Sequence, residues 1–299
     1  MGKKGLPKKL YRFRAIETPK QFDYVVNEIR NGYLYLSRPE DFNDSFDSLS
    51  ILSGNSYYDY FKDYLGFNPE IPKNLYDFVY KLEETNGCKI DFSQLVKAMG
   101  FYKDTMNVML KKNENTSSMQ SILEYNAFIN SQLRQIRIAC FTEQLRNMPM
   151  WAHYANNHRG ICLLYDTTTN MGMLHKDRFY KVQYRNQIFD AVYESIQYDR
   201  RLYSMLEECV ITKHADWSYE KEWRLVYHPA HLFACKEDVP MNYHDSGMLI
   251  DFIRPSSIYL GWRASDELCS LMRKAVEGID IKIIKIKMTE HGLKENCDE

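Results

Sequence analysis

Two glutamates stand two residues apart near the start of a predicted strand, within the segment WSYEKEWRLV at residues 217–226. Side chains two apart on a strand point to the same face, so Glu220 and Glu222 are expected to lie together, as are Glu222 and Arg224. Fixed carboxylates can serve as general bases or stabilise positive charge in a transition state. The alternative interpretation is a solvent-exposed strand face on which Glu222 and Arg224 form a weak ion pair.

A second polar and aromatic segment spans residues 140–160. A predicted strand leads there into a loop, and a short predicted helix over residues 149–156 carries Trp151 and Tyr154 three apart, on one side. Loops that leave a sheet concentrate ligand contacts, and aromatic rings placed there can stack on a ligand. The alternative is that Trp151 and Met150 belong to the hydrophobic core.

The loop at residues 37–47 is the third segment that could bind a ligand. Three polar side chains accompany two phenylalanines in it: Asn43, Asp44, Asp47, Phe42 and Phe46. The alternative, which we favour, is an ordinary turn, because Asn and Asp bend and cap chains.

Metal and nucleotide motifs are missing from the sequence. His153 and His158 are five residues apart and so fall on different faces of a helix. There is no GxGxxG, GxxxxGK[ST], HExxH or GxSxG motif. We therefore expect no metal site.

The elements that must position these segments are an irregular mixture of strands and helices. Thr18, Pro19 and Gln21 predict the start of a helix that ends near Gly32. Further helices are predicted at residues 186–210 and 265–276, and a mostly helical insertion at about 55–135. Strands are predicted at residues 10–14, 33–36, 136–141, 160–165, 179–184, 222–227, 249–252, 257–260 and 279–286. Without regular βαβ alternation, this order predicts an α+β fold with a mixed or antiparallel β core.

Composition is that of an ordinary globular protein. The 299 residues carry 39 Lys and Arg against 40 Asp and Glu, which gives no general attraction to nucleic acid. We expect one domain over residues 9–290, a basic tail at 1–8 and a flexible tail at 291–299. Seven scattered cysteines without a CxxC pair favour a reducing cytoplasm. No apolar run approaches the roughly 20 residues of a membrane span, so no membrane partner is expected.

Taken together, these segments resemble a bacterial family known as domain of unknown function 2971. The resemblance covers about residues 10–286. It is carried by YRFR at 11–14, the loop containing Phe42-Asn43-Asp44, CFT at 140–142, MWAHYA at 150–155 and EKEWRL at 220–225.

The order of elements is also similar to the ADP-ribosyltransferase superfamily, in particular to DarT-type toxins that modify DNA. The shared features are a strand–helix–strand start, an aromatic strand followed by Arg and Pro-Met, and a late Glu that opens an apolar strand. Arg12 replaces a more usual His, and the helical insertion is longer. The resemblance implies a β core of ADP-ribosyltransferase type, with Glu222 as the catalytic residue. It implies that NAD is bound by Arg12, Thr142, Arg146, Trp151 and Tyr154.

That chemistry is physically reasonable for these residue types. Cleavage of the nicotinamide–ribose bond creates an oxocarbenium-like centre that a carboxylate such as Glu222 could stabilise. Arg12 and Arg146 could bind the pyrophosphate, and Trp151 or Tyr154 could stack on a ring. The resemblance therefore implies an NAD-consuming transferase with a toxin or anti-phage role, acting on a nucleic-acid or protein acceptor. The alternative is a catalytically silent binding module for a nucleotide, nucleic acid or protein.

Overall fold

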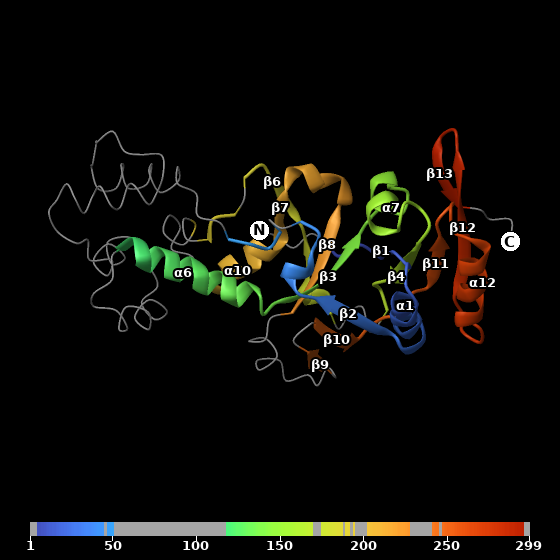
Figure 1. The fold of residues 1–299 in the computed structure, drawn as a ribbon, viewed down its shortest axis with the longest axis horizontal. Helices are drawn as coiled ribbons and strands as arrows, with labels where there is room; N and C mark the ends of the chain where they lie inside the picture. Colours follow the sequence, from blue (N-terminus) through green and yellow to red (C-terminus); the bar gives the residue numbers. More distant parts are fainter. Residues whose placement is uncertain are drawn as a thin grey trace. The chain divides into compact units, whose positions relative to one another are not determined.

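The chain divides into two compact units in a computed structural model (Figure 1). Residues 5–44, 47–50, 118–169, 175–187, 189–191, 194, 202–227, 241–244 and 247–295 are described. The first unit comprises Met1–Phe42, Ile136–Tyr184 and Ala215–Glu299, and the second comprises Asn43–Gln135 and Arg185–His214. The second unit thus contains the predicted insertion together with a later stretch of the chain.

The first unit is built on an open sheet that has eleven strands among the described residues. In chain order they are β1 (Lys9–Arg14), β2 (Tyr33–Ser37), β3 (Arg137–Thr142), β4 (Ile161–Asp166), β5 (Phe179–Lys181), β8 (Glu222–Tyr227), β9 (Met241–His244), β10 (Gly247–Asp251), β11 (Ser257–Leu260), β12 (Lys282–Thr289) and β13 (Gly292–Glu295). The main order is β13-β12-β11-β4-β1-β3-β2-β10-β9, and β8 lies between β3 and β5. Of these strand pairs, β11–β12 is parallel and the others are antiparallel. The predicted mixture of helices with a mostly antiparallel sheet is confirmed.

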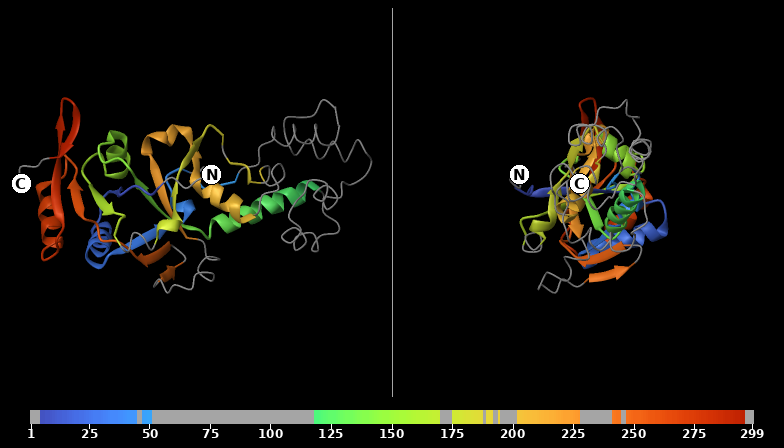
Figure 2. Two further views of the ribbon diagram at one scale, coloured as in Figure 1. Left: turned by 180° about the vertical axis from the view of Figure 1, so that it is seen from behind. Right: turned by 90° about the vertical axis from the view of Figure 1, so that its left-hand side faces the viewer.

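Three α-helices accompany the sheet in the described part of this unit. They are α1 (Pro19–Asn31), α7 (Met148–Tyr154) and α12 (Asp266–Ala275), with short 3-10 turns η1 (Pro39–Asp41), η2 (Lys176–Arg178) and η3 (Ala215–Glu220). The capping box predicted for α1 is present, because the Gln21 amide donates to the Thr18 hydroxyl and the Thr18 amide donates to the Gln21 side chain. The Ser265 hydroxyl caps α12 by accepting a bond from the Leu268 amide, and this helix runs alongside β12 (Figure 2).

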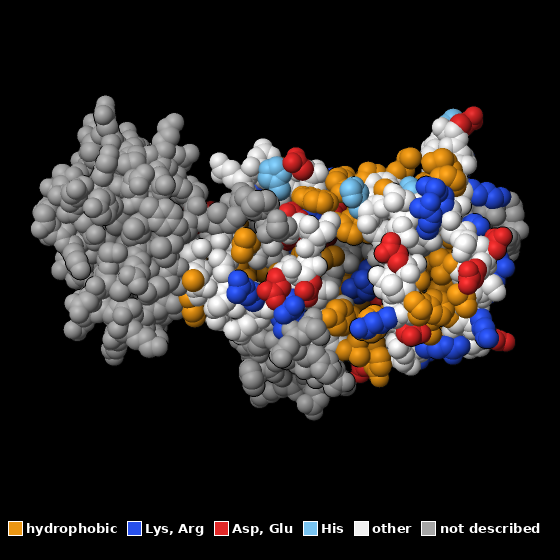
Figure 3. Space-filling model, in the orientation of Figure 1, with side chains coloured by type: hydrophobic (Ala, Val, Ile, Leu, Met, Phe, Trp, Pro, Cys, Tyr) orange, Lys and Arg blue, Asp and Glu red, His pale blue; other side chains and the backbone are white. Residues whose placement is uncertain are grey.

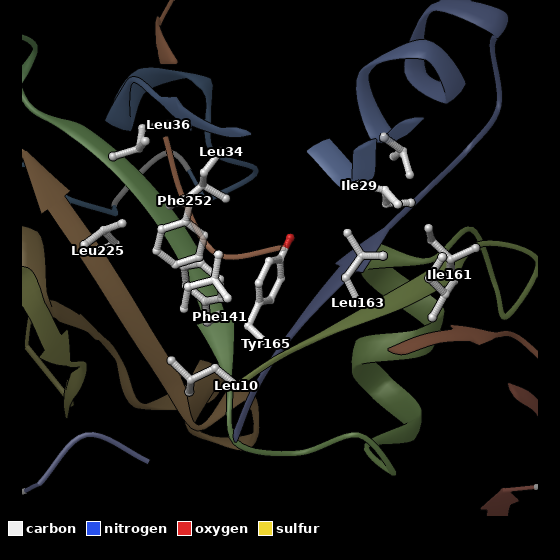
Figure 4. Packing of buried hydrophobic residues seen from close by; sticks show 14 of the residues in the cluster. Leu10, Ile29, Leu34, Leu36, Phe141, Ile161, Leu163, Tyr165, Leu225 and Phe252 are labelled. Carbon is white, nitrogen blue, oxygen red and sulfur yellow. The ribbon is translucent and has the colours of Figure 1, made fainter. Parts of the chain in front are cut away.

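The two faces of the sheet bury different hydrophobic clusters because side chains alternate along each strand. Leu10, Leu163 and Tyr165 pack toward α1, whereas Phe13, Cys162 and Leu164 pack toward α7. We call these the α1 face and the α7 face. Figure 4 shows the α1-face cluster, in which the ring of Tyr165 lies beside those of Phe141 and Phe252.

The second unit is described through its helices and a few polar contacts. Its elements are α6 (Ser118–Leu133), α10 (Leu202–Ile211) and β7 (Thr212–His214), and β6 (Gln183–Arg185) lies at the boundary in sequence. Ser50 is bonded to the side chains of Asn126 and Asn130, and Lys213 forms a buried ion pair with Asp47 at 3.5 Å. The helix predicted at 186–210 is wrong in its first turn, since residues 189–190 are not helical, whereas 202–211 are. The predicted helices at 55–117 lie outside the described residues.

The predicted tails need correction. The strand β13 lies inside the predicted C-terminal tail and pairs with β12, so residues 292–295 are part of the sheet. At the other end, Thr167 bonds the carbonyl groups of Pro7 and Lys8. Among the described helices, none is long and apolar enough to span a membrane.

Candidate functional site

A polar strip lies on the α7 face where β1, β3 and β8 are neighbours. The register pairs Tyr11 with Thr142 and Thr142 with Glu222, and directly paired residues point to the same face. Arg224, two residues after Glu222, shares that face. The structure therefore brings together Thr142 and Glu222, two of the predicted site residues.

Glu222 and Arg224 form a buried ion pair rather than an exposed one. The Arg224 Nε donates to Glu222 Oε1 at 2.8 Å and its Nη2 to Oε2 at 3.1 Å, and the two side chains are 0% and 4% exposed. The guanidinium also lies over the ring of Phe42, 5.6 Å from its centroid. The solvent-exposed alternative is thus wrong. Both Glu222 oxygens accept hydrogen bonds from the same arginine, which fixes the carboxylate in place.

Arg12 lies on the opposite face of the sheet from Glu222. Its guanidinium is over the ring of Phe141, pairs with Glu28 of α1 at 3.5 Å and donates to the carbonyl of Tyr35 at 2.9 Å. Burial, and then the charge of Arg14, lower the pKa of Arg12 to about 10. Arg12 therefore anchors α1 to the sheet, and it cannot share a ligand with Glu222 across the strands.

Trp151 differs from its predicted ligand-stacking role, and Arg146 lies at the surface. Trp151 is fully buried, with its indole N–H donated to the Leu145 carbonyl at 2.7 Å and its ring edge-on to Phe13. The core alternative for Trp151 is therefore correct, and its ring is not available to a ligand. Arg146 is 61% exposed and lies 3.6 Å from Glu295 of β13.

Three hydrogen bonds tie η3 to the end of β3, to the loop before α7 and to α7 itself. The Thr142 hydroxyl donates to the Glu220 carbonyl at 2.5 Å, and the Asn147 amide donates to the Tyr219 carbonyl at 2.5 Å while its oxygen caps α7. The Tyr154 hydroxyl donates to the buried Glu220 carboxylate at 2.5 Å. These bonds hold η3 against α7, and they give Thr142 and Tyr154 positioning roles.

Glu220 and Glu222 do not belong to one strand, contrary to the prediction that they share a strand face. Glu220 ends η3, and Lys221 between them has φ 46°, in the left-handed region. Strand alternation is therefore interrupted before β8 begins. Glu220 reaches its partner Tyr154 because of η3, not because of the pleat.

Three aromatic rings gather beside this connection, and we call them the aromatic cluster: His153, Trp217 and Tyr219. The ring of His153 stacks on Tyr219 at 6.2 Å with an interplanar angle of 30°, and meets Trp217 edge-on at 6.3 Å. Trp217 and Tyr219 are themselves 6.1 Å apart. His153 is exposed and the other two rings are half-buried. Figure 3 shows histidine and hydrophobic side chains close together over α7 and β8.

A strained turn follows α7 and leads to β4. Asn156, Asn157 and His158 have φ of 46°, 51° and 67° in succession, and each such residue costs about 1–2 kcal/mol, least for Asn. Gly160 and Gly261 permit the close contact that the turn requires, since a Cβ on either would lie 2.2 Å or 2.1 Å from a backbone oxygen. We call Asn156–His158 the left-handed turn.

The polar loop at 37–47 is a turn in its described part. Arg38 pairs with Glu40 and Asp41, and the Asp47 amide donates to the Asp44 carbonyl at 3.1 Å. Phe42, under Arg224, is the member of the loop that reaches the polar strip. Residues 45–46, including the predicted Phe46, lie outside the described residues.

Sequence reasoning thus found part of the site and missed the rest. His153 was considered only as a metal ligand together with His158, and their spacing excluded that pairing. Trp217 and Tyr219 were noted only as neighbours of the glutamates. The signal available was three aromatic residues close to two predicted loop ends, which periodicity alone cannot place together. No group of three or more His, Cys, Asp or Glu able to hold a metal occurs among the side chains described.

The fold and site define a mostly antiparallel sheet protein with an aromatic cluster at the entry to β8. Residues 150–225 match the model of a family described as "Protein of unknown function (DUF2971)". The predicted resemblance to this family is confirmed over that segment, which contains the aromatic cluster, the left-handed turn and Glu222. Searches of curated proteins and of solved structures found no match. The similarity to ADP-ribosyltransferases stays a prediction.

Proposed function

We propose that this protein is a ligand-binding module that holds the base of a nucleotide on the aromatic cluster. The observation that carries the proposal is the geometry of His153, Trp217 and Tyr219, three partly accessible rings within 6.3 Å of one another. Flat rings of this kind bind other planar rings through stacking, with little side-chain entropy to lose. The bonds from Asn147 and Tyr154 hold the cluster ready before a ligand arrives.

Binding has better support than NAD cleavage. A transferase would need a carboxylate that reaches the ribose hydroxyls, yet both oxygens of Glu222 are bound to Arg224 and the side chain is 4% exposed. The residue expected to hold the pyrophosphate, Arg12, lies on the other face of the sheet. NAD turnover remains the second candidate, favoured by the pairing of Thr142 with Glu222 on one face.

Tryptophan fluorescence provides a direct binding test. The protein has four tryptophans, of which Trp151 and Trp223 are buried. In a Trp262→Phe background, quenching by a ligand in solution therefore reports mainly on Trp217. We expect AMP, GMP, ADP-ribose or NAD to quench this signal saturably.

Variants of the cluster then locate the site. Base–aromatic stacking contributes about 1–3 kcal/mol, so Tyr219→Leu should weaken nucleotide binding by roughly 5-fold to 150-fold. The matched control is Tyr24→Leu, which changes a tyrosine on α1 that is 61% exposed. Equal effects of the two substitutions, or no saturable quenching, would contradict the proposal.

Incubation with NAD separates the two candidate functions. A binding module should release no nicotinamide, with or without added nucleic acid or lysate, while still binding the nucleotide. Nicotinamide release by the wild type that is lost in Glu222→Gln, with folding intact, would replace the binding proposal by the transferase.

A further inference from the structure

A second aromatic surface lies where the left-handed turn meets the residues after β11. The ring of His158 is parallel to that of buried Trp151, at 6.1 Å and 8°, and lies 6.0 Å from the ring of Trp262. Trp262 is 37% exposed, and the Arg263 guanidinium lies over its ring at 5.6 Å. We call His158, Trp262 and Arg263 the turn site.

The backbone holds the turn site rigidly. The Arg263 amide donates to the His158 carbonyl at 3.0 Å, and the Gly261 amide donates to the Gly160 carbonyl at 3.0 Å. The close approach of Gly261 to the His158 carbonyl excludes any side chain at position 261. Trp262 is therefore presented from a fixed backbone, as a preformed stacking surface requires.

Two features of the left-handed turn lower the stability of the folded protein. Three successive non-glycine residues take the left-handed conformation, and the buried Nδ1 of His158 has no hydrogen-bond partner in the described structure. Strain and unsatisfied polar atoms of this kind concentrate where a ligand is bound. Both occur at the residues that position Trp262.

The charge of the turn site indicates what it binds. Arg263 is exposed and lies over the Trp262 ring, and Arg159, the residue that follows His158 in the chain, is exposed as well. Aromatic rings beside cations are the combination that holds single-stranded nucleic acids, because each base can stack while its phosphate is neutralised. A free apolar ligand would gain nothing from the two arginines.

The two aromatic surfaces both contact the hydrophobic cluster on the α7 face of the sheet. Tyr154 and Tyr219 pack on the α7-face cluster, and Trp151 of that cluster is the ring on which His158 stacks. We infer that the turn site stacks a second base, so that the ligand is a single-stranded nucleic acid and not a mononucleotide. This inference rests on the proposed function for its first base.

Fluorescence anisotropy with labelled single strands tests the inference. The probes are DNA and RNA strands of about ten nucleotides, within the length that comparable binding surfaces occupy, and AMP competes for the site. We expect at least one strand to bind about tenfold or more tightly than AMP. A duplex of the same sequence should bind more weakly, because its bases are already stacked on one another.

Substitutions at Trp262 identify the second base. Trp262→Leu should remove most of the advantage of the strand over AMP while AMP binding is unchanged, and Trp262→Phe should keep it. Arg263→Ala should lower the slope of log K against log salt by about 0.7, the share of one phosphate on a single strand. Leu271→Ala, at a residue 42% exposed on α12, is the control and should change nothing.

The outcomes separate the two proposals. If AMP binds but the strand has no advantage, or if Trp262→Leu leaves that advantage intact, the inference is overturned and the nucleotide module stands. If neither AMP nor any strand binds, the proposed function fails and this inference fails with it.

Discussion

Removing one member of the buried Glu222–Arg224 pair tests the energetics of the site most directly. In Arg224→Met the carboxylate of Glu222 loses both of its bonds from the guanidinium in a place where its side chain is 4% exposed. A buried charge deprived of its partner costs about 3–5 kcal/mol. Breaking an exposed pair would cost at most about 1 kcal/mol. The buried and the exposed interpretations therefore predict losses of unfolding free energy that differ several-fold.

Urea unfolding followed by tryptophan fluorescence gives the measurement. All four tryptophans lie in the first unit, so their emission reports on that unit alone. The control is Arg146→Met, because Arg146 is 61% exposed and its partner Glu295 is 3.6 Å away. We expect the free energy of unfolding of this control variant to fall by less than about 1 kcal/mol.

A double-mutant cycle isolates the pair itself. Glu222→Gln removes the charge that loses the guanidinium in Arg224→Met, so the double variant should be less destabilised than the sum of the two single variants. A coupling of about 1–3 kcal/mol is expected for contacting buried groups. A loss below about 1 kcal/mol in Arg224→Met, or strict additivity in the cycle, would refute the view that this pair is buried and mutually dependent.

Three further predictions follow from the backbone and from titration. Gly261→Ala should destabilise the first unit by more than about 1 kcal/mol, seen in urea unfolding, because its Cβ would lie 2.1 Å from the His158 oxygen; wild-type stability would contradict the close approach. Lys221→Gly should instead raise stability by up to about 1 kcal/mol, since Lys221 is exposed at φ 46°; a loss would mean that its conformation is not strained. Burial lowers the pKa of His175, so the unfolded chain binds a proton first as pH falls below about 6.5, and stability drops from there downward. His175→Gln should flatten the fall between about pH 7 and pH 5 in unfolding experiments; an unchanged slope would contradict this assignment.

Much of the secondary structure was determined by local sequence. The capping box at Thr18 and Gln21 and the cap at Ser265 fixed where two helices begin, because these side chains bond the nearest backbone amides. The strand at 222–227 was predicted with the bounds that the structure has. Such features depend on neighbours in the chain and can be read without the fold.

Sequence spacing also predicted which residues of a strand share a face. It did not predict which elements pack against each face of the sheet. Arg12 and Glu222 both belong to strands that were predicted correctly. Only the pairing of β1 with β3 and of β3 with β8 decides that they lie on opposite faces. A glutamate and an arginine two residues apart have the same spacing whether their ion pair is exposed or buried. The burial of the Glu222–Arg224 pair could therefore not be predicted from the sequence.

The sequence by itself therefore determined the class of elements, the caps and the family resemblance that residues 150–225 confirm. The tertiary structure decided which rings meet. His153 joins Trp217 and Tyr219 although more than sixty residues separate them, and the left-handed turn meets Gly261 across a hundred residues. The physical reason is that periodicity carries information over a few turns or strands, whereas contacts between distant segments are fixed by the register of the sheet and by the packing that buries its two faces.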